Sequence, residues 1–274
     1  MSVISIVSIK GGTGKTTTAL NLGAALANHG KKVLLIDSDS QGNLTKALGQ
    51  IPAELKYTLS NLMTQAIDEP DMLPEFISRA TIQKSDNLDF IPANKRLANV
   101  LTRLIVMQTN RPLFGNDANS LRSEFVLKAV VDTVRSAYEY IIIDCGPNRD
   151  QQMLNVLTAA DEVIVPIQAH FLDAEGLPDT LEMIRMVKSS LNPNLRILGV
   201  LLTMFHSRTK LAQAIQNEVE TSYGMDVPVF SRQIDYSVRV AEHPIYGQSI
   251  FDYDPKNPAA LAYDFVAEEV IANG

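Results

Sequence analysis

The sequence predicts an α/β fold: a single-domain, doubly wound and mostly parallel sheet with helices on both faces. Short apolar runs alternate with segments of helical spacing along the 274 residues. Runs such as residues 32–37 (KVLLID) and 140–144 (YIIID) are apolar almost throughout, as expected for strands buried on both faces. Because parallel strands need crossover helices, the alternation favours one doubly wound sheet.

The remaining elements follow from the same patterns. Further strands are expected at residues 88–91, 162–167, 195–203 and 227–230, after a first strand that begins at residue 3. Helical spacing is found at residues 14–30, 96–108, 121–137, 173–191, 209–223 and 258–271. Prolines interrupt the region around residues 49–87. We therefore expect one domain over residues 1–274, with a helical surface insertion around residues 49–87.

Composition limits the class of protein. A hydrophobic share of 46% and a charged share of 20% are ordinary for a globular domain, and no apolar run approaches the roughly 18 residues that span a bilayer. The single cysteine, Cys145, excludes a disulfide framework and favours a reducing cytoplasm. The net charge of −7 means that any nucleic-acid binding must come from a local basic patch.

The first strand leads into a glycine-rich turn, VISIVSIKGGTGKTTT at residues 3–18. Glycines allow backbone N–H groups to close on an anion, a following lysine adds positive charge, and a threonine hydroxyl can ligate Mg²⁺. The turn departs from G-x-x-x-x-G-K-[ST] because Ile9 replaces the first glycine, and it carries a second lysine. The expected nucleotide-binding residues are Lys10, Gly11, Gly12, Thr13, Gly14, Lys15, Thr16 and Thr17.

Carboxylates follow two of the predicted strands. Asp144 ends the run YIIID, which is the pattern of a Walker B element, and Asp37 and Asp39 follow KVLLID in the segment DSDSQGN. Ligands bind at the carboxyl ends of strands in open α/β sheets. A solvated turn with capping aspartates remains the alternative for Asp37 and Asp39.

These motifs resemble those of ParA/Soj-type partition and cargo-positioning ATPases, in the deviant Walker A (ParA/MinD) group. The loop KGGTGKT has the signature early lysine of that group. DSDSQGN resembles switch I, with Ser40 in place of proline, and DCGPN resembles switch II, with Gly146 in place of the first proline. VPIQAHFLDAEGL, TMFHSRTKLAQ and VRVAEHPIYGQSI also match, so the resemblance extends from residue 3 to about residue 273.

The resemblance implies a P-loop NTPase fold and an Mg²⁺-dependent ATPase that works as an ATP-bound homodimer. The implied catalytic residues are Lys10, Lys15 and Asp39, with Lys10 reaching the nucleotide of the partner subunit and Asp39 positioning the attacking water. The implied metal residues are Thr16, Asp37 and Asp144.

The resemblance also implies non-specific DNA binding and stimulation of hydrolysis by a ParB-like partner protein. Such a protein is cytoplasmic and nucleoid-associated, and it positions a plasmid, a chromosome origin or a compartment such as a carboxysome. Basic residues at the positions of Arg208 and Arg239 contribute to DNA binding in the family, and Lys210 lies beside the first of them. A solvated helix face is the alternative reading of these residues.

Other nucleotide-dependent classes are less well supported. A GTPase would need N-K-x-D, and NKRL at Asn94 lacks the aspartate. A MinD-like membrane-surface ATPase would end in a basic amphipathic helix, whereas AYDFVAEEVIANG is acidic. A metabolic P-loop enzyme that transfers phosphate to a small molecule is the third possibility, against which Lys10 and the C-terminal match argue. The family's adenine contacts near residues 234–239 do not transfer safely, because Asp235 and Tyr236 replace the usual Pro-Arg.

Overall fold

A seven-stranded sheet forms the centre of the chain in the computed structural model, which describes residues 1–110, 121–169, 176–207, 209–224 and 227–273. The strand order is β3-β4-β2-β5-β1-β6-β7, and every pair is parallel except β3 with β4. The strands are β1 (Ser2–Ile6), β2 (Val33–Ser38), β3 (Ile82–Ser85), β4 (Leu88–Ile91), β5 (Tyr140–Cys145), β6 (Glu162–Gln168) and β7 (Arg196–Thr203). The predicted fold class is confirmed.

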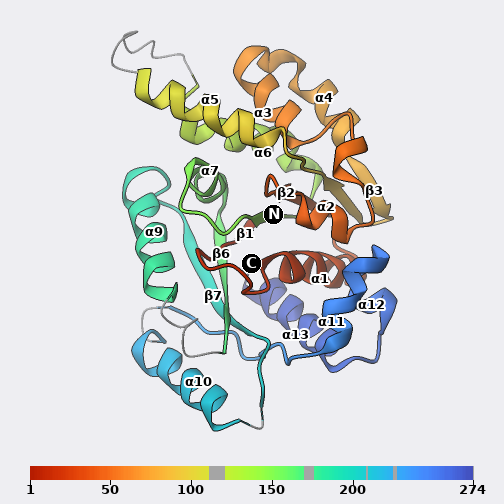
Figure 1. Cartoon of the computed structure of the whole chain (residues 1–274), viewed down its shortest axis with the longest axis vertical. Helices are drawn as coiled ribbons and strands as arrows, with labels where there is room; N and C mark the ends of the chain where they lie inside the picture. The colour runs from red at the N-terminus through yellow and green to blue at the C-terminus, as the bar shows by residue number, and fades with distance from the viewer. Residues whose placement is uncertain (111–120, 170–175, 208, 225–226, 274) are drawn as a thin grey trace.

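Helices cover both faces of this sheet, as Figure 1 shows. They are α1 (Lys15–Asn28), α2 (Asn43–Ala47), α3 (Leu59–Asp68), α4 (Leu73–Ala80), α5 (Leu97–Asn110), α6 (Val126–Val134), α7 (Gln151–Ala159), α9 (Gly176–Ser190), α10 (Lys210–Ser222), α11 (Val238–Glu242), α12 (Ile250–Tyr253) and α13 (Pro258–Asn273). A short 3-10 helix, η5 (His243–Tyr246), joins α11 to the loop before α12.

Side-chain alternation along the strands divides the hydrophobic core in two. In β2, Val33 and Leu35 pack in the cluster that contains residues of α1, α2 and α13, whereas Leu34 and Ile36 pack in the cluster with α3, α5, α6 and α7. Successive residues of a strand point to opposite faces, so a sheet covered on both sides is apolar at every position. This explains the unbroken apolar runs of the sequence.

Most strands lie within two residues of their predicted bounds, but the sheet differs from expectation at two places. Edge strand β3 was not anticipated, because its sequence IQKS is mostly exposed and carries no apolar pattern. The expected strand at residues 227–230 is wrong: only an isolated bridge joins Val200 to Val229. The predicted helix at residues 121–137 is shortened to α6, with 3-10 turns on either side.

The segment around residues 49–87 contributes to both the core and the sheet. Leu62 and Met63 of α3 are fully buried, and Ile77 of α4 lies in the same hydrophobic cluster. The segment ends in β3, which pairs with β4. Its helices therefore cover one face of the sheet rather than forming a separate body.

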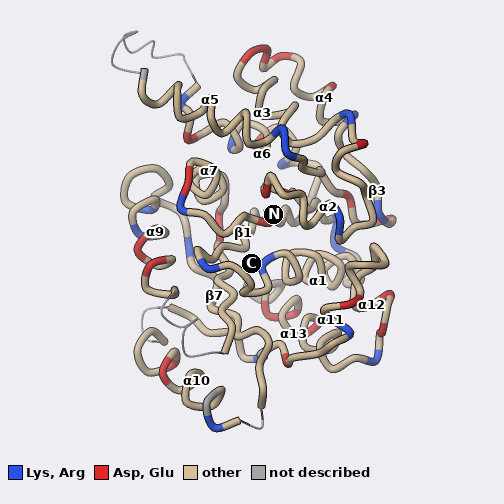
Figure 2. Tube along the Cα trace, in the orientation of Figure 1, with Lys and Arg blue, Asp and Glu red and all other residues tan. Residues whose placement is uncertain are grey.

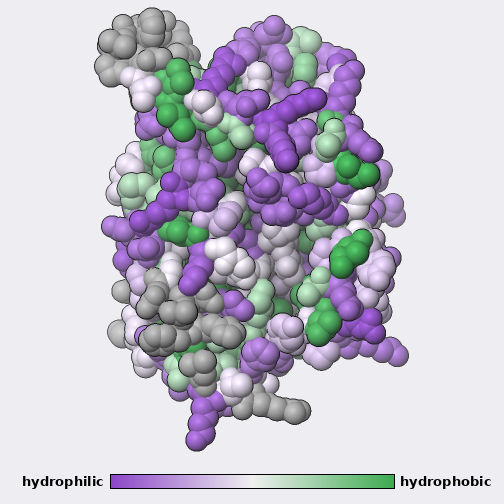
Figure 3. Space-filling view, in the orientation of Figure 1, coloured by the Kyte–Doolittle hydropathy of each residue, from purple (hydrophilic) through white to green (hydrophobic). Residues whose placement is uncertain are grey.

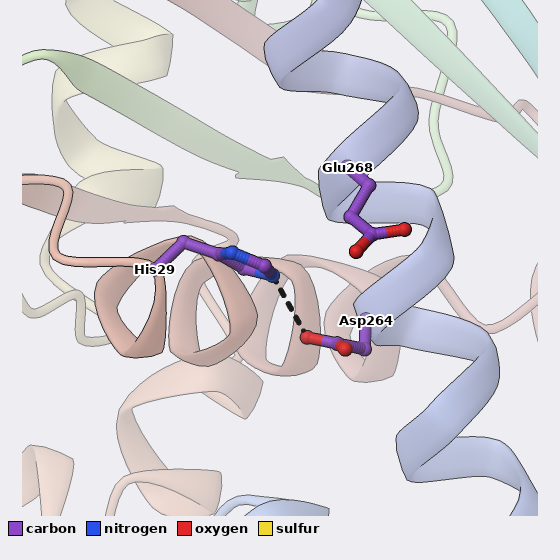
Figure 4. Close-up of side chains that lie close together, drawn as sticks. All are labelled: His29, Asp264 and Glu268. Carbon is purple, nitrogen blue, oxygen red and sulfur yellow. Dashed lines mark hydrogen bonds and ion pairs between the residues drawn. The ribbon is translucent and has the colours of Figure 1, made fainter.

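The visible surface in Figure 3 is mainly hydrophilic, with separate small hydrophobic spots. Among the described residues, no helix is both long and apolar enough to cross a membrane. On the surface, His29 at the end of α1 pairs with Asp264 of α13, with 2.9 Å between His29 Nε2 and Asp264 Oδ1, and Glu268 lies one turn further along the helix (Figure 4). This exposed ion pair joins two helices that already pack together through buried side chains.

Two glycines hold the loop after α2 against the loop after η5. Gly49 and Gly247 both have positive φ angles, of 85° and 65°, and a Cβ added to Gly247 would lie 2.7 Å from the Cα of Gly49. Lys84 of β3 donates from Nζ to the carbonyl oxygens of Leu48 and Gly247, at 3.3 and 2.8 Å. The first helix after β2 is thereby attached to the C-terminal segment.

Replacing Gly247 with alanine tests this attachment. Gly247→Ala combines left-handed strain with a backbone clash, so we expect it to lower the free energy of unfolding by about 3 kcal/mol. Gly30→Ala is the matched control, because Gly30 has φ of 76° but open space around it, and it should cost only about 1 kcal/mol. Equal losses in chemical denaturation would show that the contact with Gly49 contributes nothing.

Candidate active site

The glycine-rich turn connects β1 to α1 at the carboxyl edge of the sheet. Gly12 and Gly14 have φ angles of 79° and 84°, a conformation that glycine adopts without strain. Thr203, the last residue of β7, anchors the turn: its Oγ1 donates to the Thr13 carbonyl oxygen at 2.8 Å. A Cβ added to Gly14 would lie 3.6 Å from the Thr203 side chain. The turn therefore approaches β7 closely.

Lys15 is the first residue of α1, and its side chain folds back inside the turn. Its Nζ donates to the Lys10 carbonyl oxygen at 2.7 Å, and the residue is buried. Burial lowers the pKa of Lys15, and the negative charge of Asp144 opposes that shift. The ammonium group is thus held close to the carboxylates that follow the neighbouring strands.

Strand register brings two of the predicted carboxylates together. β2 and β5 are neighbours, and Asp37 is paired with Asp144 across them. Thr16 Oγ1 donates to Asp144 Oδ2 at 2.7 Å, which links the start of α1 to the end of β5. Burial raises the pKa of Asp144 well above its usual value, and the charge of Asp37 raises it further.

Asp37 is fully buried, which excludes the alternative of a solvated capping aspartate. One oxygen accepts hydrogen bonds from the backbone N–H and the hydroxyl of Thr45, at 2.8 and 2.6 Å. Burial raises the pKa of Asp37 to about 6, and the bonds from Thr45 oppose that rise. Asp37 thereby fixes the start of α2 relative to β2.

Asp39 lies at the rim of the same group and is half-buried. It accepts hydrogen bonds from the Gln41 backbone at 2.9 Å and from Asn43 Nδ2 at 3.0 Å. A Cβ added to Gly146 would lie 3.5 Å from Asp39 Oδ1, so the two loops that follow β2 and β5 meet at this carboxylate.

Lys10 lies on the other side of the turn. It is half-buried, and its Cβ and Cδ would be 3.4 and 3.5 Å from a Cβ added to Gly176. Its stem therefore runs along the first residue of α9. Gly11 and Gly12 next to it are exposed.

The group fits a hard divalent cation. Three carboxylates lie beside one lysine, and the two that are fully buried, Asp37 and Asp144, repel each other when both are ionised. Asp144 Oδ1 is buried and has no hydrogen-bond partner among the described residues. Buried charges need a partner or a metal, and Mg²⁺ prefers oxygen ligands such as carboxylates and hydroxyls. Thr16 and Asp144 could ligate the ion or its waters, with Asp37 behind them.

Two of the three predicted DNA-binding residues, Lys210 and Arg239, lie on separate helices of the described structure. Lys210 begins α10 and Arg239 lies in α11, and Figure 1 draws these helices on opposite sides of the lower half of the chain. Both residues are exposed. Arg239 donates to Tyr253 Oη at 3.2 Å and lies 3.6 Å from Glu242. Arg208 lies outside the described residues, and in Figure 2 the described basic residues are spread over many elements.

Comparison with known proteins assigns the family. The model of an AAA domain family (AAA_31) matches residues 1–197. The sporulation initiation inhibitor protein Soj of Bacillus subtilis is 39% identical over 272 residues, covering 99% of this chain and 99% of that protein. The chromosome partitioning protein ParA of Caulobacter vibrioides is 36% identical over 275 residues, covering 99% and 94%. The chain belongs to the ParA/Soj family.

Solved structures of similar fold contain bound nucleotide and magnesium. Cobyrinic acid a,c-diamide synthase from Mycobacterium smegmatis, with bound ADP and magnesium, superimposes with a TM-score of 0.80 at 30% identity, covering 100% of this chain and 95% of that chain. A second structure of that protein holds an ATP analogue and magnesium. As a member of the ParA/Soj family, whose relatives include a chromosome-partitioning ATPase, this chain is an ATPase that uses ATP and Mg²⁺. The resemblance inferred from the motifs is confirmed.

Sequence reasoning missed several polar residues that position the site of the ParA/Soj chain. Thr45 holds Asp37, and Thr203 holds the phosphate-loop turn from a distant strand. Thr203 does end an apolar run at the carboxyl edge of the sheet, which was an available signal. Thr45 carried no such signal, because only the folded chain brings it to Asp37.

Removing the Thr203 hydroxyl tests its role as an anchor. Thr203→Val keeps the side-chain volume but loses the bond to the Thr13 carbonyl, so the dissociation constant for ATP should rise about fivefold. Thr158→Val is the matched control, because Thr158 is equally buried and donates to Leu154 inside α7. Equilibrium titration with a fluorescent ATP analogue measures both variants. An unchanged ATP affinity in Thr203→Val would show that the Thr203 hydroxyl does not contribute to ATP binding.

Proposed function

We propose that this protein is a partition ATPase whose ATP-bound homodimer binds DNA without sequence preference and positions a cargo. The observation that carries the proposal is the phosphate turn, in which Lys15 lies beside the carboxylates and a second lysine, Lys10, lies on the other side. The chain's full-length relatives include Soj and a chromosome partitioning ParA. The cargo is of the partition class, such as a plasmid, a chromosome origin or a protein compartment.

In the proposed site, the turn from Lys10 to Thr17 holds the triphosphate. Lys15 turns from the Lys10 carbonyl to the outer phosphates, since its buried ammonium lies at the centre of the turn. Mg²⁺ supplies positive charge to the phosphate oxygens during cleavage. Thr16 and Asp144 would hold that ion and Asp37 would support its waters, while Asp39 orients the attacking water from the rim.

Lys10 is assigned to the nucleotide of the partner subunit. Lys15 already occupies the interior of the turn, whereas the stem of Lys10 lies against Gly176 at the start of α9. A positive charge delivered across a dimer interface can stabilise charge on the transferred phosphoryl group, as an arginine finger does. Lys10 and Lys15 therefore have different tasks on the same turn.

A cavity of about 350 Å³ is lined in part by Phe205, two residues along the chain from Thr203, which contacts the phosphate turn. This cavity is the proposed site for the adenine base. It is lined by Phe205, Asp235 and Tyr236 among others, and Tyr236 stacks on His206 with ring centroids 5.0 Å apart. Asp235 Oδ1 is buried without a hydrogen-bond partner among the described residues. A carboxylate acceptor suits the exocyclic amino group of adenine and opposes the O6 acceptor of guanine, which supports ATP over GTP.

DNA binding is assigned to Arg208, Lys210 and Arg239, with a ParB-like partner protein stimulating hydrolysis and release. Support for it comes from the family and from the exposure of Lys210 and Arg239. The proposed location is the cytoplasm, on the nucleoid and away from the membrane. Because the net charge is −7, binding should be weak and sensitive to salt.

A metabolic P-loop enzyme is the second candidate, favoured by the match to cobyrinic acid a,c-diamide synthase. Such an enzyme would turn over ATP in response to a small acceptor molecule rather than to DNA or a protein. The higher identities to Soj and ParA over nearly the whole chain favour the partition role.

Replacing each of two proposed catalytic residues, Asp39 and Lys10, with alanine separates dimerisation from hydrolysis. Asp39→Ala should bind ATP, stop hydrolysis and sediment as a stable dimer, because the attacking water is no longer oriented. Lys10→Ala should lose hydrolysis with ATP affinity retained. Lys32→Ala, an exposed lysine at the amino end of β2, serves as the control and should behave as wild type. ATPase assays and sedimentation with ATP test this, and a wild type that stays monomeric would contradict the dimer.

Reversing the charge of Arg239 tests the DNA surface. Arg239→Glu should abolish ATP-dependent binding to random-sequence DNA at low salt while ATP affinity stays unchanged. Arg185→Glu makes the same charge change on the exposed face of α9 and should retain binding. Fluorescence anisotropy with labelled duplex measures both. Equal DNA binding by the two variants would show that Arg239 does not contribute to the DNA-binding surface.

A further inference from the structure

A buried polar pair joins the loop that carries Asp39 to helix α7. Gln152 Nε2 donates to Ser38 Oγ, and the two residues are 4% and 1% exposed. Ser38 is the last residue of β2, and Gln152 is the second residue of α7. No role proposed above uses either side chain.

The pair lies directly behind the proposed catalytic carboxylates. Ser38 stands between Asp37 and Asp39, and alternation along the strand turns it to the opposite face, toward α7. The loop that leads into α7 contains Gly146, which faces Asp39. The segment from the end of β5 into α7 therefore contacts the Asp39 segment twice, at Gly146 in the loop and at Gln152 in the helix.

This pair is unusual for its surroundings. Its neighbours on the same face, Ile36 of β2 and Met153 of α7, belong to the hydrophobic core. Gln152 Oε1 is buried and has no hydrogen-bond partner among the described residues. An unsatisfied buried amide is destabilising, and two apolar side chains of similar size would avoid that cost. Stability alone does not account for a glutamine here.

We propose that Gln152 is a positioning residue for ATP hydrolysis: by holding Ser38, it fixes the backbone that carries Asp39 against the loop after β5. The inference rests on the proposed role of Asp39 and adds to it the element that places the carboxylate. ATP and Mg²⁺ binding use the other face of β2 and the turn after β1, so they do not depend on Gln152.

Gln151 provides a matched control within the same helix. It is 6% exposed and also donates its amide to a serine, Ser123, at 3.3 Å. Ser123 lies in the 3-10 turn before α6 and not at the end of a site strand. The variants Gln152→Leu and Gln151→Leu therefore make the same chemical change at neighbouring buried positions, only one of which touches the Asp39 segment.

The experiment measures single-turnover ATP hydrolysis, the dissociation constant for ATP and thermal stability in the full chain. Gln152→Leu should lower the hydrolysis rate about tenfold while ATP affinity stays within about twofold of wild type, because loss of a positioning contact affects the transition state alone. Gln151→Leu should hydrolyse ATP at the wild-type rate. Ser38→Ala should reproduce the loss, and the double variant with Gln152→Leu should be no slower than either single variant.

Equal hydrolysis rates in Gln152→Leu and Gln151→Leu would overturn the inference, as would additive losses in the double variant. A rate that falls only in proportion to thermal stability or ATP affinity would assign Gln152 a structural role and overturn it too. If Gln152→Leu fails to fold, Ser38→Ala decides the question alone. Failure of the proposed function is a separate result, because it would appear in the wild type: a chain that stays monomeric with ATP, or that hydrolyses ATP only with a small acceptor molecule.

Discussion

Two fully buried carboxylates at paired positions of neighbouring strands are the constraint on which the site depends. Asp37 and Asp144 meet because β2 and β5 are parallel and in register, and burial raises the pKa of both. Such a pair is stable only with hydrogen bonds and nearby positive charge. Thr45, Thr16 and Lys15 supply these in the described structure, and in the proposed function a divalent cation would add further positive charge.

Contacts between distant segments hold the loops at this edge of the sheet in place. Thr203 ties the phosphate turn to β7, and the contact of Gly49 with Gly247 ties the segment after α2 to the C-terminal part of the chain. Each anchor is a polar or glycine contact between segments that are far apart in sequence. Loops at the edge of the site are thus attached to the sheet at a few defined points.

Local patterns predicted every strand of the sheet except β3, and they predicted which carboxylates lie at its carboxyl edge. The runs KVLLID and YIIID are apolar because both faces of the sheet are covered, and the aspartates that end them lie where the strand direction requires. Strand β3 escaped prediction because an exposed edge has no apolar pattern. Gln152 also escaped prediction, because its partner lies on another element and no local spacing reveals it. Thr203 ends an apolar run at the carboxyl edge of the sheet, but only the folded chain shows its bond to Thr13.

The most direct test of the Mg²⁺–ATP site is a crystal structure with a non-hydrolysable ATP analogue and Mn²⁺ in place of Mg²⁺, with the metal located by its anomalous scattering. The metal should lie beside the β- and γ-phosphates, in contact with Thr16 Oγ1, and Asp144 Oδ1 should bind the ion or one of its waters. Lys15 should have left the Lys10 carbonyl for the phosphates. A metal elsewhere, for example at His29 and Asp264, or phosphates outside the glycine turn, would contradict the account.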